Sequence, residues 1–204
     1  MVDRPTLYAY EAHAAQYAQD WLDQAAPDDM YALLEQYFSP GPTADVGCGA
    51  GRDTAWLASR GFDVRGYDAS AALLAEARLH HPSLTFELAA LPALAGVPSG
   101  AFRNVLCETV VMHLDPADAA AAAARLAELL MPGGTLYLSW RVAGSGALRD
   151  ERGRLYTPLD SARMHAALGA GMHVIDEHEM VSASSGKRVH RLIARRADDA
   201  DRAA

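Results

Sequence analysis

Glycine occurs at alternate positions in one short stretch of the chain, Asp-Val-Gly-Cys-Gly-Ala-Gly at residues 45–51. This stretch lies between a short apolar run and an amphipathic one, and glycine lets the backbone turn tightly and approach a ligand closely. It therefore predicts a nucleotide-binding turn between a strand and a helix. A dinucleotide fingerprint would place its third glycine at position 52, where the chain has Arg52, so the spacing disfavours NAD.

Three other features follow this glycine stretch in order. Asp68 comes 68 − 47 = 21 residues after Gly47, a strand-like run ending in His-Leu occupies residues 105–114, and Met-Pro-Gly-Gly-Thr-Leu occupies residues 131–136. Together with the D-x-G-x-G-x-G pattern, this order resembles the class I S-adenosylmethionine (SAM) dependent methyltransferases over roughly residues 40–196.

The resemblance implies an α/β fold. It would be a Rossmann-like three-layer αβα sandwich, with a mostly parallel seven-stranded sheet and a C-terminal antiparallel β-hairpin. Predicted strands that alternate with predicted helices also favour a parallel sheet covered on both faces.

The resemblance further implies that SAM is the cofactor, with its methionine moiety along the glycine stretch and Asp45 near its amine. Asp68 is expected to accept hydrogen bonds from both ribose hydroxyls, because a carboxylate presents paired acceptors to a diol. An N-cap for the following helix is the alternative role of Asp68. Related enzymes often hold adenine with an acid after the third strand, where this chain has Ala90 and Leu91, so backbone groups would have to bind adenine. The predicted cofactor-binding residues are Tyr17, Asp45, Gly47, Cys48, Gly49, Arg52, Asp68, Ala69, Ala90, Leu91, Glu108 and Thr109.

His113 is the predicted catalytic residue. Methyl transfer from a sulfonium is an in-line displacement, and placing the nucleophile and excluding water can supply much of the rate. A base is needed only when the acceptor carries a proton that must leave. Histidine titrates near neutrality, and His113 follows the predicted fourth strand, at the rim where the acceptor should bind. The alternative is that His113 only orders the entry to the helix that begins at Asp115.

Arginines and aromatic residues gather after the predicted fifth strand. Four arginines in residues 141–154 could bind a carboxylate or phosphate of the acceptor, or they could pair with acidic residues of the same loop. The Asn-Pro-Pro-Tyr motif that marks nucleobase and amide methylation in related enzymes is absent after Cys107, which disfavours those acceptors. The predicted substrate-binding residues are Tyr10, His13, His113, Trp140, Arg141, Arg152 and Tyr156.

The chain is expected to divide into an N-terminal helical lid (residues 1–40), a methyltransferase domain (41–196) and a disordered tail (197–204). One amphipathic helix is predicted in the lid, because Tyr10, Ala14, Tyr17 and Trp21 recur at helical spacing. Its aromatic face would either pack on the body of the domain or close over the methionine end of the cofactor. A second lid helix is expected to be capped by Asp28 or Asp29.

The remaining elements follow from apolar periodicity, capping residues and glycine or proline stops. Strands are predicted at residues 43–46, 62–67, 84–88, 102–107 and 135–140, with a terminal hairpin of strands at 173–181 and 189–195. Helices are predicted at residues 52–60, after Ser70, after Asp115-Pro116 and at 159–168. Residues 142–158 are expected to form a long polar loop.

Composition excludes several classes of function. The net charge is −8 and Lys187 is the one lysine, so no basic surface is expected to bind nucleic acid. No apolar run is long enough to span a membrane, and the N-terminus lacks the apolar region of a secretory signal, which favours the cytoplasm. The two cysteines, Cys48 and Cys107, are expected to be reduced, and no metal is predicted.

The sequence therefore predicts an enzyme that transfers a methyl group from SAM to an O, N, S or C atom of a small molecule, which could be anionic. The enzyme is expected to act as a monomer or homodimer. Two other functions stay open at this stage: a SAM-binding regulatory or partner module without catalysis, and an NAD(P)-binding oxidoreductase.

Overall fold

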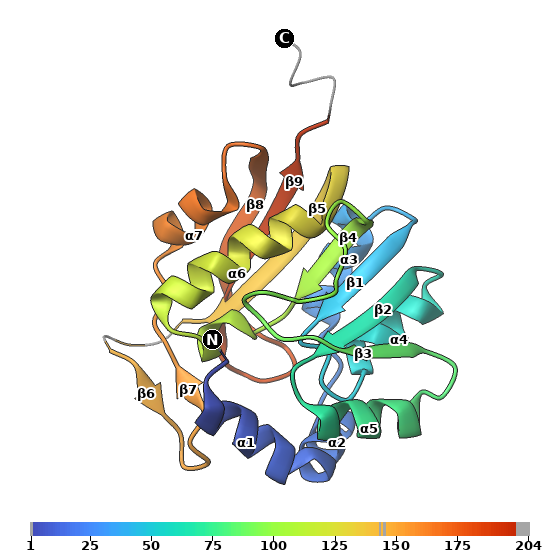
Figure 1. Ribbon diagram of the computed structural model, residues 1–204, viewed down its shortest axis with the longest axis vertical. Helices are drawn as coiled ribbons and strands as arrows, with labels where there is room; N and C mark the ends of the chain where they lie inside the picture. The colour runs from blue at the N-terminus through green and yellow to red at the C-terminus, as the bar shows by residue number, and fades with distance from the viewer. Residues whose placement is uncertain (1, 143, 145, 199–204) are drawn as a thin grey trace.

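A computed structural model describes residues 2–142, 144 and 146–198 of the chain. Its main feature is a seven-stranded sheet with the strand order β3-β2-β1-β4-β5-β9-β8, which crosses the centre of Figure 1. Its strands are β1 (Pro42–Val46), β2 (Asp63–Asp68), β3 (Thr85–Leu88), β4 (Phe102–Cys107), β5 (Leu130–Arg141), β8 (Met172–Val181) and β9 (Arg188–Arg196).

All the strand pairs from β3 to β5 are parallel, whereas β9 is antiparallel to both of its neighbours, β5 and β8. The terminal hairpin thus inserts its second strand between β5 and β8. Parallel strands need helical crossovers, and helices cover both faces of this sheet. The predicted fold class is confirmed.

Alternate residues of the central strands face opposite helical layers. The helices that cover the sheet are α3 (Asp28–Tyr37), α4 (Arg52–Ser59), α5 (Ala71–His80), α6 (Pro116–Leu129) and α7 (Ser161–Leu168). Leu106 and Tyr137 pack in one cluster with α3 and α4, whereas their neighbours Val105 and Leu136 pack in another with α6 and α7. Such alternation is what a sheet buried on both faces requires.

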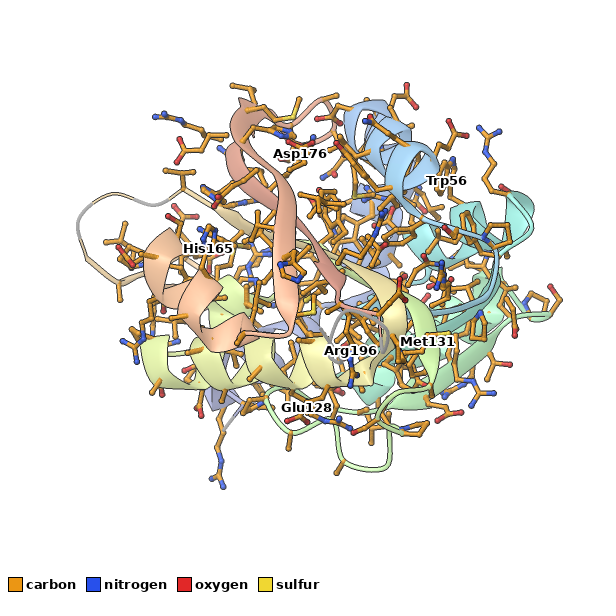
Figure 2. The ribbon with its side chains drawn as sticks, turned by 90° about the horizontal axis from the view of Figure 1, so that it is seen from above. Trp56, Glu128, Met131, His165, Asp176 and Arg196 are labelled. Carbon is orange, nitrogen blue, oxygen red and sulfur yellow. The ribbon has the colours of Figure 1, made fainter. Side chains whose placement is uncertain are left out.

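Figure 2 shows the three layers from above. Helix α7, which carries His165, and α6, which carries Glu128, lie on one side of the strands, and α4, which carries Trp56, lies on the other. Two of the predicted helix starts are confirmed by their caps: the Ser70 hydroxyl accepts a hydrogen bond from the Leu73 amide, and the Asp115 carboxylate accepts bonds from two amides of the first turn of α6.

The N-terminal segment forms two helices, α1 (Arg4–Ala12) and α2 (Ala14–Asp23), and not the single helix that the aromatic spacing predicted. The backbone leaves the helical conformation at His13, where φ is −128° and ψ is 25°. The break lets the two helices follow different surfaces. The hydroxyl of Thr6 in α1 accepts a bond from the Leu155 amide, while Tyr17 of α2 packs with Leu73 of α5. Tertiary contacts have overridden a continuous helical periodicity.

The start of α3 also differs from the prediction. Pro27 is the N-cap residue and provides no side-chain cap, whereas Asp28 and Asp29 both lie inside the first turn. The Asp29 carboxylate instead lies 2.8 Å from the guanidinium of Arg191 in β9. The Asp29 carboxylate, which the local pattern predicted as a possible helix cap, therefore forms a long-range ion pair instead.

Strand β5 begins at Leu130, earlier than the predicted start at Thr135. Helix α6 ends at Leu129, before the proline and glycines of residues 132–134, and the chain passes directly into strand pairing, with Phe102 opposite Leu130 and Asn104 opposite Thr135. The extra residues between these two pairs form a bulge, which glycine accommodates.

The predicted long loop contains a small two-stranded antiparallel sheet, β6 (Leu148–Arg149) and β7 (Leu155–Tyr156). In Figure 1 this arm lies at one end of the main sheet, beside α1. At the C-terminus the Ala197 amide donates to the Gly171 carbonyl at 2.9 Å, and residues 199–204 of the predicted tail lie outside the described residues.

Candidate functional site

The C-terminal ends of β1, β2 and β4 meet under α1 and α2 and form the floor of a cavity. It holds about 820 Å³ of free space, including the part open to solvent, which is within the range of ligand pockets. We call it the first cavity. It is lined by Val2, Asp3, Thr6, Leu7, Tyr10, Trp21, Val46, Gly47, Gly49, Asp68, Ala69, Ser70, Leu73, Ala89, Leu91, Glu108, Thr109, Val110, His113 and Leu114.

A second cavity of about 760 Å³ lies on the α4 side of the glycine stretch. Its lining is more polar, and it shares with the first cavity the glycines of the turn, Trp21, Glu108 and Thr109. The two cavities therefore meet above the C-terminal ends of β1 and β4. The second cavity is lined by Trp21, Gln24, Pro27, Gly47, Cys48, Gly49, Arg52, Asp53, Glu108, Thr109, Arg141, Ser182, Ser184 and Ser185.

Two glycines of the turn, Gly47 and Gly49, are required by their backbone conformation and by the lack of room for a side chain. Gly47 has φ +77°, and a Cβ atom there would lie 2.2 Å from Cγ2 of Val110. Gly49 has φ +55°, and a Cβ atom there would lie 2.7 Å from the ring of Trp21. Because both positions combine the left-handed conformation with a close neighbour, only glycine fits them without a shift.

Asp68 closes this turn from the end of β2. One of its carboxylate oxygens accepts a hydrogen bond from the Gly49 amide at 2.9 Å, and the other accepts one from the Ser70 amide at 2.8 Å. Burial raises the pKa of Asp68, although these amide hydrogen bonds oppose the shift. The cap of α5 is the Ser70 side chain, so the alternative role of Asp68 as an N-cap is wrong.

Two further carboxyl groups lie under the turn. Asp45 accepts a hydrogen bond from the Thr54 hydroxyl at 2.6 Å, and burial, with a smaller contribution from Asp53, raises its pKa to about 7. Glu108 accepts a hydrogen bond from the Ser139 hydroxyl, and burial raises its pKa as well. A cationic ligand in these cavities would favour the ionised form of both groups.

Thr109 occupies a strained position where the two cavities meet. Its φ of +54° lies in the left-handed region, which is costly for a β-branched residue. The Ser139 hydroxyl accepts the Thr109 amide at 2.9 Å while it donates to Glu108, so one side chain of β5 holds the turn after β4.

His113 lies in the short 3-10 helix η1 (Val111–His113), on the wall of the first cavity. Its Nδ1 is 2.6 Å from the carbonyl oxygen of Leu155 and its Nε2 is 3.0 Å from the hydroxyl of Tyr10. Burial, with smaller contributions from Arg154 and Arg141, lowers the pKa of His113 to about 4. The imidazole is therefore neutral near pH 7.

The arginines of residues 141–154 divide into two groups. Arg149 makes an ion pair with Asp3 at 2.8 Å, and Arg154 makes one with Asp150 at 2.7 Å. Arg141 and Arg152 have no ion pair within the described ranges, and they lie over the rings of Tyr156 and Tyr17 respectively.

The structure brings most of the predicted cofactor residues together around the two cavities. Several other predicted residues lie elsewhere. Trp140 is buried in the core, where it stacks on His190 at 4.4 Å, and His13 lies at the junction of α1 and α2. The predicted residues that line neither cavity are His13, Tyr17, Asp45, Ala90, Trp140, Arg152 and Tyr156.

The sequence prediction also missed several lining residues. The helical spacing marks Trp21 only as part of an aromatic stripe, although it lines both cavities. Ser182, Ser184 and Ser185 come from the turn between β8 and β9, far along the chain from the glycine stretch, and no local pattern marks them. The sequence marks Ser70 only as the residue that caps α5, although Ser70 also lines the first cavity.

Across the described residues there is no group of three or more His, Cys, Asp or Glu side chains that could hold a metal ion. A search of the helices in the same part of the chain finds none with the length and apolarity needed to cross a membrane.

Comparison with known proteins gives one family. Residues 44–134 match the family model of a methyltransferase domain. The chain is 39% identical over 134 residues to the ubiquinone biosynthesis O-methyltransferase of Alkalilimnicola ehrlichii, which covers 63% of this chain and 51% of that protein. The protein of the same name from Methylococcus capsulatus is 41% identical over 100 residues, covering 47% of this chain and 41% of its own length. The chain thus spans about half the length of the curated relatives it matches.

Solved structures share the fold over most of the chain. The 1,6-didemethyltoxoflavin-N1-methyltransferase of Burkholderia thailandensis, with bound 1,6-didemethyltoxoflavin and S-adenosylhomocysteine, superposes with a TM-score of 0.74 at 22% identity, over 95% of this chain and 88% of that one. The [4+2]-cyclase SpnF superposes with a TM-score of 0.64 at 18% identity, over 84% of this chain and 81% of its own. A cyclase among these neighbours shows that the fold alone does not determine the reaction.

The family model spans the segment that builds the floor of both cavities. It begins in β1, includes the glycine stretch, Asp68 and His113, and ends at the bulge of β5. The sequence match therefore applies to the site itself and not only to the surrounding fold. Residues 44–134 are thus similar to the methyltransferase-domain family, and the chain as a whole shares the fold of solved methyltransferase structures.

Proposed function

We propose that this chain binds SAM and transfers its methyl group to a small-molecule acceptor. The observation that carries the proposal is the joint placement of the glycine turn and the Asp68 carboxylate on one cavity, which extends to His113. Gly47 and Gly49 line both cavities with backbone atoms alone, which lets a ligand approach the turn closely.

Named residues would hold each part of the cofactor. Asp68 would accept hydrogen bonds from the ribose hydroxyls, and the apolar side chains of Ala69, Ala89 and Leu91 would pack against adenine. The methionine end would lie along the glycine turn toward the second cavity, near the carboxyl groups of Asp45 and Glu108. When bound, SAM supplies an electrophilic methyl group next to a sulfonium charge.

Calorimetry tests the cofactor assignment directly. We expect SAM and S-adenosylhomocysteine to bind the wild type, with no measurable binding of NAD. Asp68→Ala should weaken SAM binding at least 10-fold, which corresponds to about 1.4 kcal/mol, because a charge-assisted hydrogen bond is lost. Asp63→Ala, at the exposed start of the same strand, is the matched control and should leave the affinity unchanged. A wild type that does not bind SAM would sink the proposal.

The acceptor is proposed to be a small molecule. Support comes from the ubiquinone O-methyltransferases and the toxoflavin N1-methyltransferase among the similar proteins, and from the net charge of −8 with a single lysine. An anionic group on the acceptor would be recognised by Arg141, which faces the second cavity without an ion pair in the part of the chain that the structure describes. A cytoplasmic location and a monomeric or homodimeric state belong to the same proposal and rest on the sequence.

A further inference from the structure

Both ring nitrogens of His113 already have partners. A carbonyl oxygen can only accept a hydrogen bond, so the Nδ1 atom that faces Leu155 must carry the hydrogen. Nε2 is then unprotonated and accepts a hydrogen bond from the Tyr10 hydroxyl at 3.0 Å. His113 therefore has no nitrogen left to contact an acceptor while Tyr10 stays in place.

The Tyr10 hydroxyl oxygen is the atom of this pair that remains available. Tyr10 lines the first cavity beside His113. Its oxygen donates to His113, and the Arg154 guanidinium approaches the same oxygen at 3.4 Å. A phenolic oxygen has two lone pairs, so at least one can accept a hydrogen bond from a ligand. Burial raises the pKa of Tyr10 to about 12, which keeps the proton on its oxygen at neutral pH.

We propose, on the basis of the proposed methyl transfer, that Tyr10 takes the proton of the acceptor and that the acceptor atom is a hydroxyl oxygen. The acceptor proton moves to the Tyr10 oxygen while the proton of Tyr10 moves to Nε2 of His113. In the same step an O–C bond to the methyl group forms and the S–C bond breaks with its electron pair on sulfur. His113 becomes an imidazolium that keeps its Nδ1 hydrogen bond to Leu155, and it later returns the proton to water through Tyr10.

The lowered pKa of His113 favours a hydroxyl over an aliphatic amine as the methyl acceptor. The His113 imidazole faces Tyr10 from α1 and Arg141 from β5. Arg154 and Tyr156 face it from the β6–β7 arm. The charge of Asp150, on the same arm, acts in the opposite direction to the arginines and raises the pKa of His113. Burial and the two arginines make His113 a weak base, so it accepts most readily a proton that becomes acidic during the reaction. A hydroxyl proton becomes strongly acidic as its oxygen gains a methyl group, whereas the ammonium formed from an aliphatic amine does not.

The relay exists only when α1 is docked. The Asp3 carboxylate pairs with Arg149 through two hydrogen bonds of 2.8 Å, and the Thr6 hydroxyl accepts the Leu155 amide at 2.8 Å. Leu155 thus holds both α1 and the imidazole of His113. Docking of α1 on the β6–β7 arm places the tyrosine, and the same arm orients the histidine, so the proton path would be completed as the cavity closes.

Tyr10→Phe tests the relay, because it keeps the buried ring and removes only the oxygen. Tyr8→Phe is the matched control, since Tyr8 lies on the same helix with 74% of its surface exposed. The acceptor probes are catechol and the aliphatic diamine 1,2-diaminocyclohexane. We expect the wild type to methylate catechol and not the diamine, and Tyr10→Phe to lose roughly 100-fold in kcat, as expected for removal of a proton acceptor. SAM affinity by calorimetry should be equal in all three proteins.

Two further measurements separate proton transfer from a structural role. Catechol should bind the S-adenosylhomocysteine complex of Tyr10→Phe more weakly than that of the wild type or Tyr8→Phe. Wild-type kcat should fall as the pH drops through about 4, where His113 becomes protonated, and the residual turnover of Tyr10→Phe should lose this dependence. Circular dichroism at each pH confirms that the proteins stay folded.

Three results would overturn the relay or its hydroxyl acceptor. Equal turnover of Tyr10→Phe and wild type would remove Tyr10 from the proton path. Methylation of the diamine but not catechol, or no turnover of catechol by a wild type that binds SAM, would overturn the hydroxyl assignment. A wild type that fails to bind SAM would instead contradict the proposed function, so the two failures are distinguishable.

Discussion

At the scale of single residues, the candidate site contains three buried carboxyl groups. Asp45, Asp68 and Glu108 lie at the ends of β1, β2 and β4, and burial raises the pKa of each one. Burial thus disfavours the ionised form of each group. A sulfonium and an ammonium brought close to them would oppose this pKa shift, because a nearby opposite charge stabilises the ionised form.

SAM binding should therefore release protons. The pKa of Asp45 is about 7 in the free protein and would fall in the complex, so below pH 7 the carboxyl group must ionise on binding. The affinity for SAM should rise with pH toward 7 and level off above it. Calorimetry in two buffers with different ionisation enthalpies measures the released protons. Asp45→Asn should reduce their number, and an identical heat of binding in both buffers would contradict the prediction.

Gly47→Ala separates two reasons for glycine in the turn. Gly47 and Gly61 share nearly the same positive φ, +77° and +85°, but a Cβ atom meets Val110 at Gly47 and nothing within 4 Å at Gly61. Gly61→Ala should cost about 1–2 kcal/mol of unfolding free energy from the backbone conformation alone. Gly47→Ala should cost more and should abolish SAM binding. Urea denaturation and calorimetry measure both, and equal behaviour of the two variants would show that the clash with Val110 is unimportant.

At the scale of elements, the turns that follow β1, β2 and β4 determine where the side chains of the site lie. Each parallel strand ends at the same edge of the sheet, and a helix begins after each turn. Ser70 has a role in both the helix and the site, because it caps α5 and also lines the first cavity. The same local interaction that starts a helix therefore supports the wall beside Asp68.

Ser70→Ala should destabilise the protein by about 1 kcal/mol, because the Leu73 amide at the start of α5 loses its side-chain acceptor. Ser83→Ala, at an exposed position between α5 and β3, is the control and should change stability little. Urea denaturation followed by circular dichroism measures both variants. The cap would be unimportant if the two variants unfolded at the same urea concentration.

At the scale of the whole molecule, an ion pair joins the N-terminal helices to the C-terminal hairpin. Arg191 of β9 is fully buried and lies 2.8 Å from the carboxylate of Asp29 at the start of α3. The Asp29 carboxylate also accepts the Ala183 amide of the β8–β9 turn, whose serines line the second cavity. Segments from the two ends of the chain are thus fixed together at the site.

Asp29→Ala should destabilise the fold by about 3 kcal/mol, because it leaves the guanidinium of Arg191 buried without its ion-pair partner. The double variant Asp29→Leu with Arg191→Met should recover much of this loss, since it removes both charges. Asp28→Ala, at the exposed neighbouring position, serves as the control. Thermal and urea unfolding measure the series. A single variant as stable as the control would show that the pair contributes little.

The sequence by itself determined the order along the chain of the seven strands of the main sheet and the position of the glycine turn that is proposed to bind the cofactor. Those features depend on interactions a few residues apart: glycine stretches, helix caps and apolar periodicity. The glycine turn, Asp68 and the caps at Ser70 and Asp115 are all of this local kind, and the fold class follows from the alternation of elements.

Only the tertiary structure decided where the remaining groups lie. The break at His13, the pairing of Asp29 with Arg191, the extension of β5 by a bulge and the burial of Trp140 all depend on residues distant along the chain. The same is true of the contact between Tyr10 and His113, which are 103 residues apart. Contacts of this kind are set by how whole elements pack, and a local pattern carries no record of them. The glycine turn and Asp68, which are proposed to bind the donor, could therefore be located from the chain, whereas the groups proposed to act on the acceptor became visible only in the folded molecule.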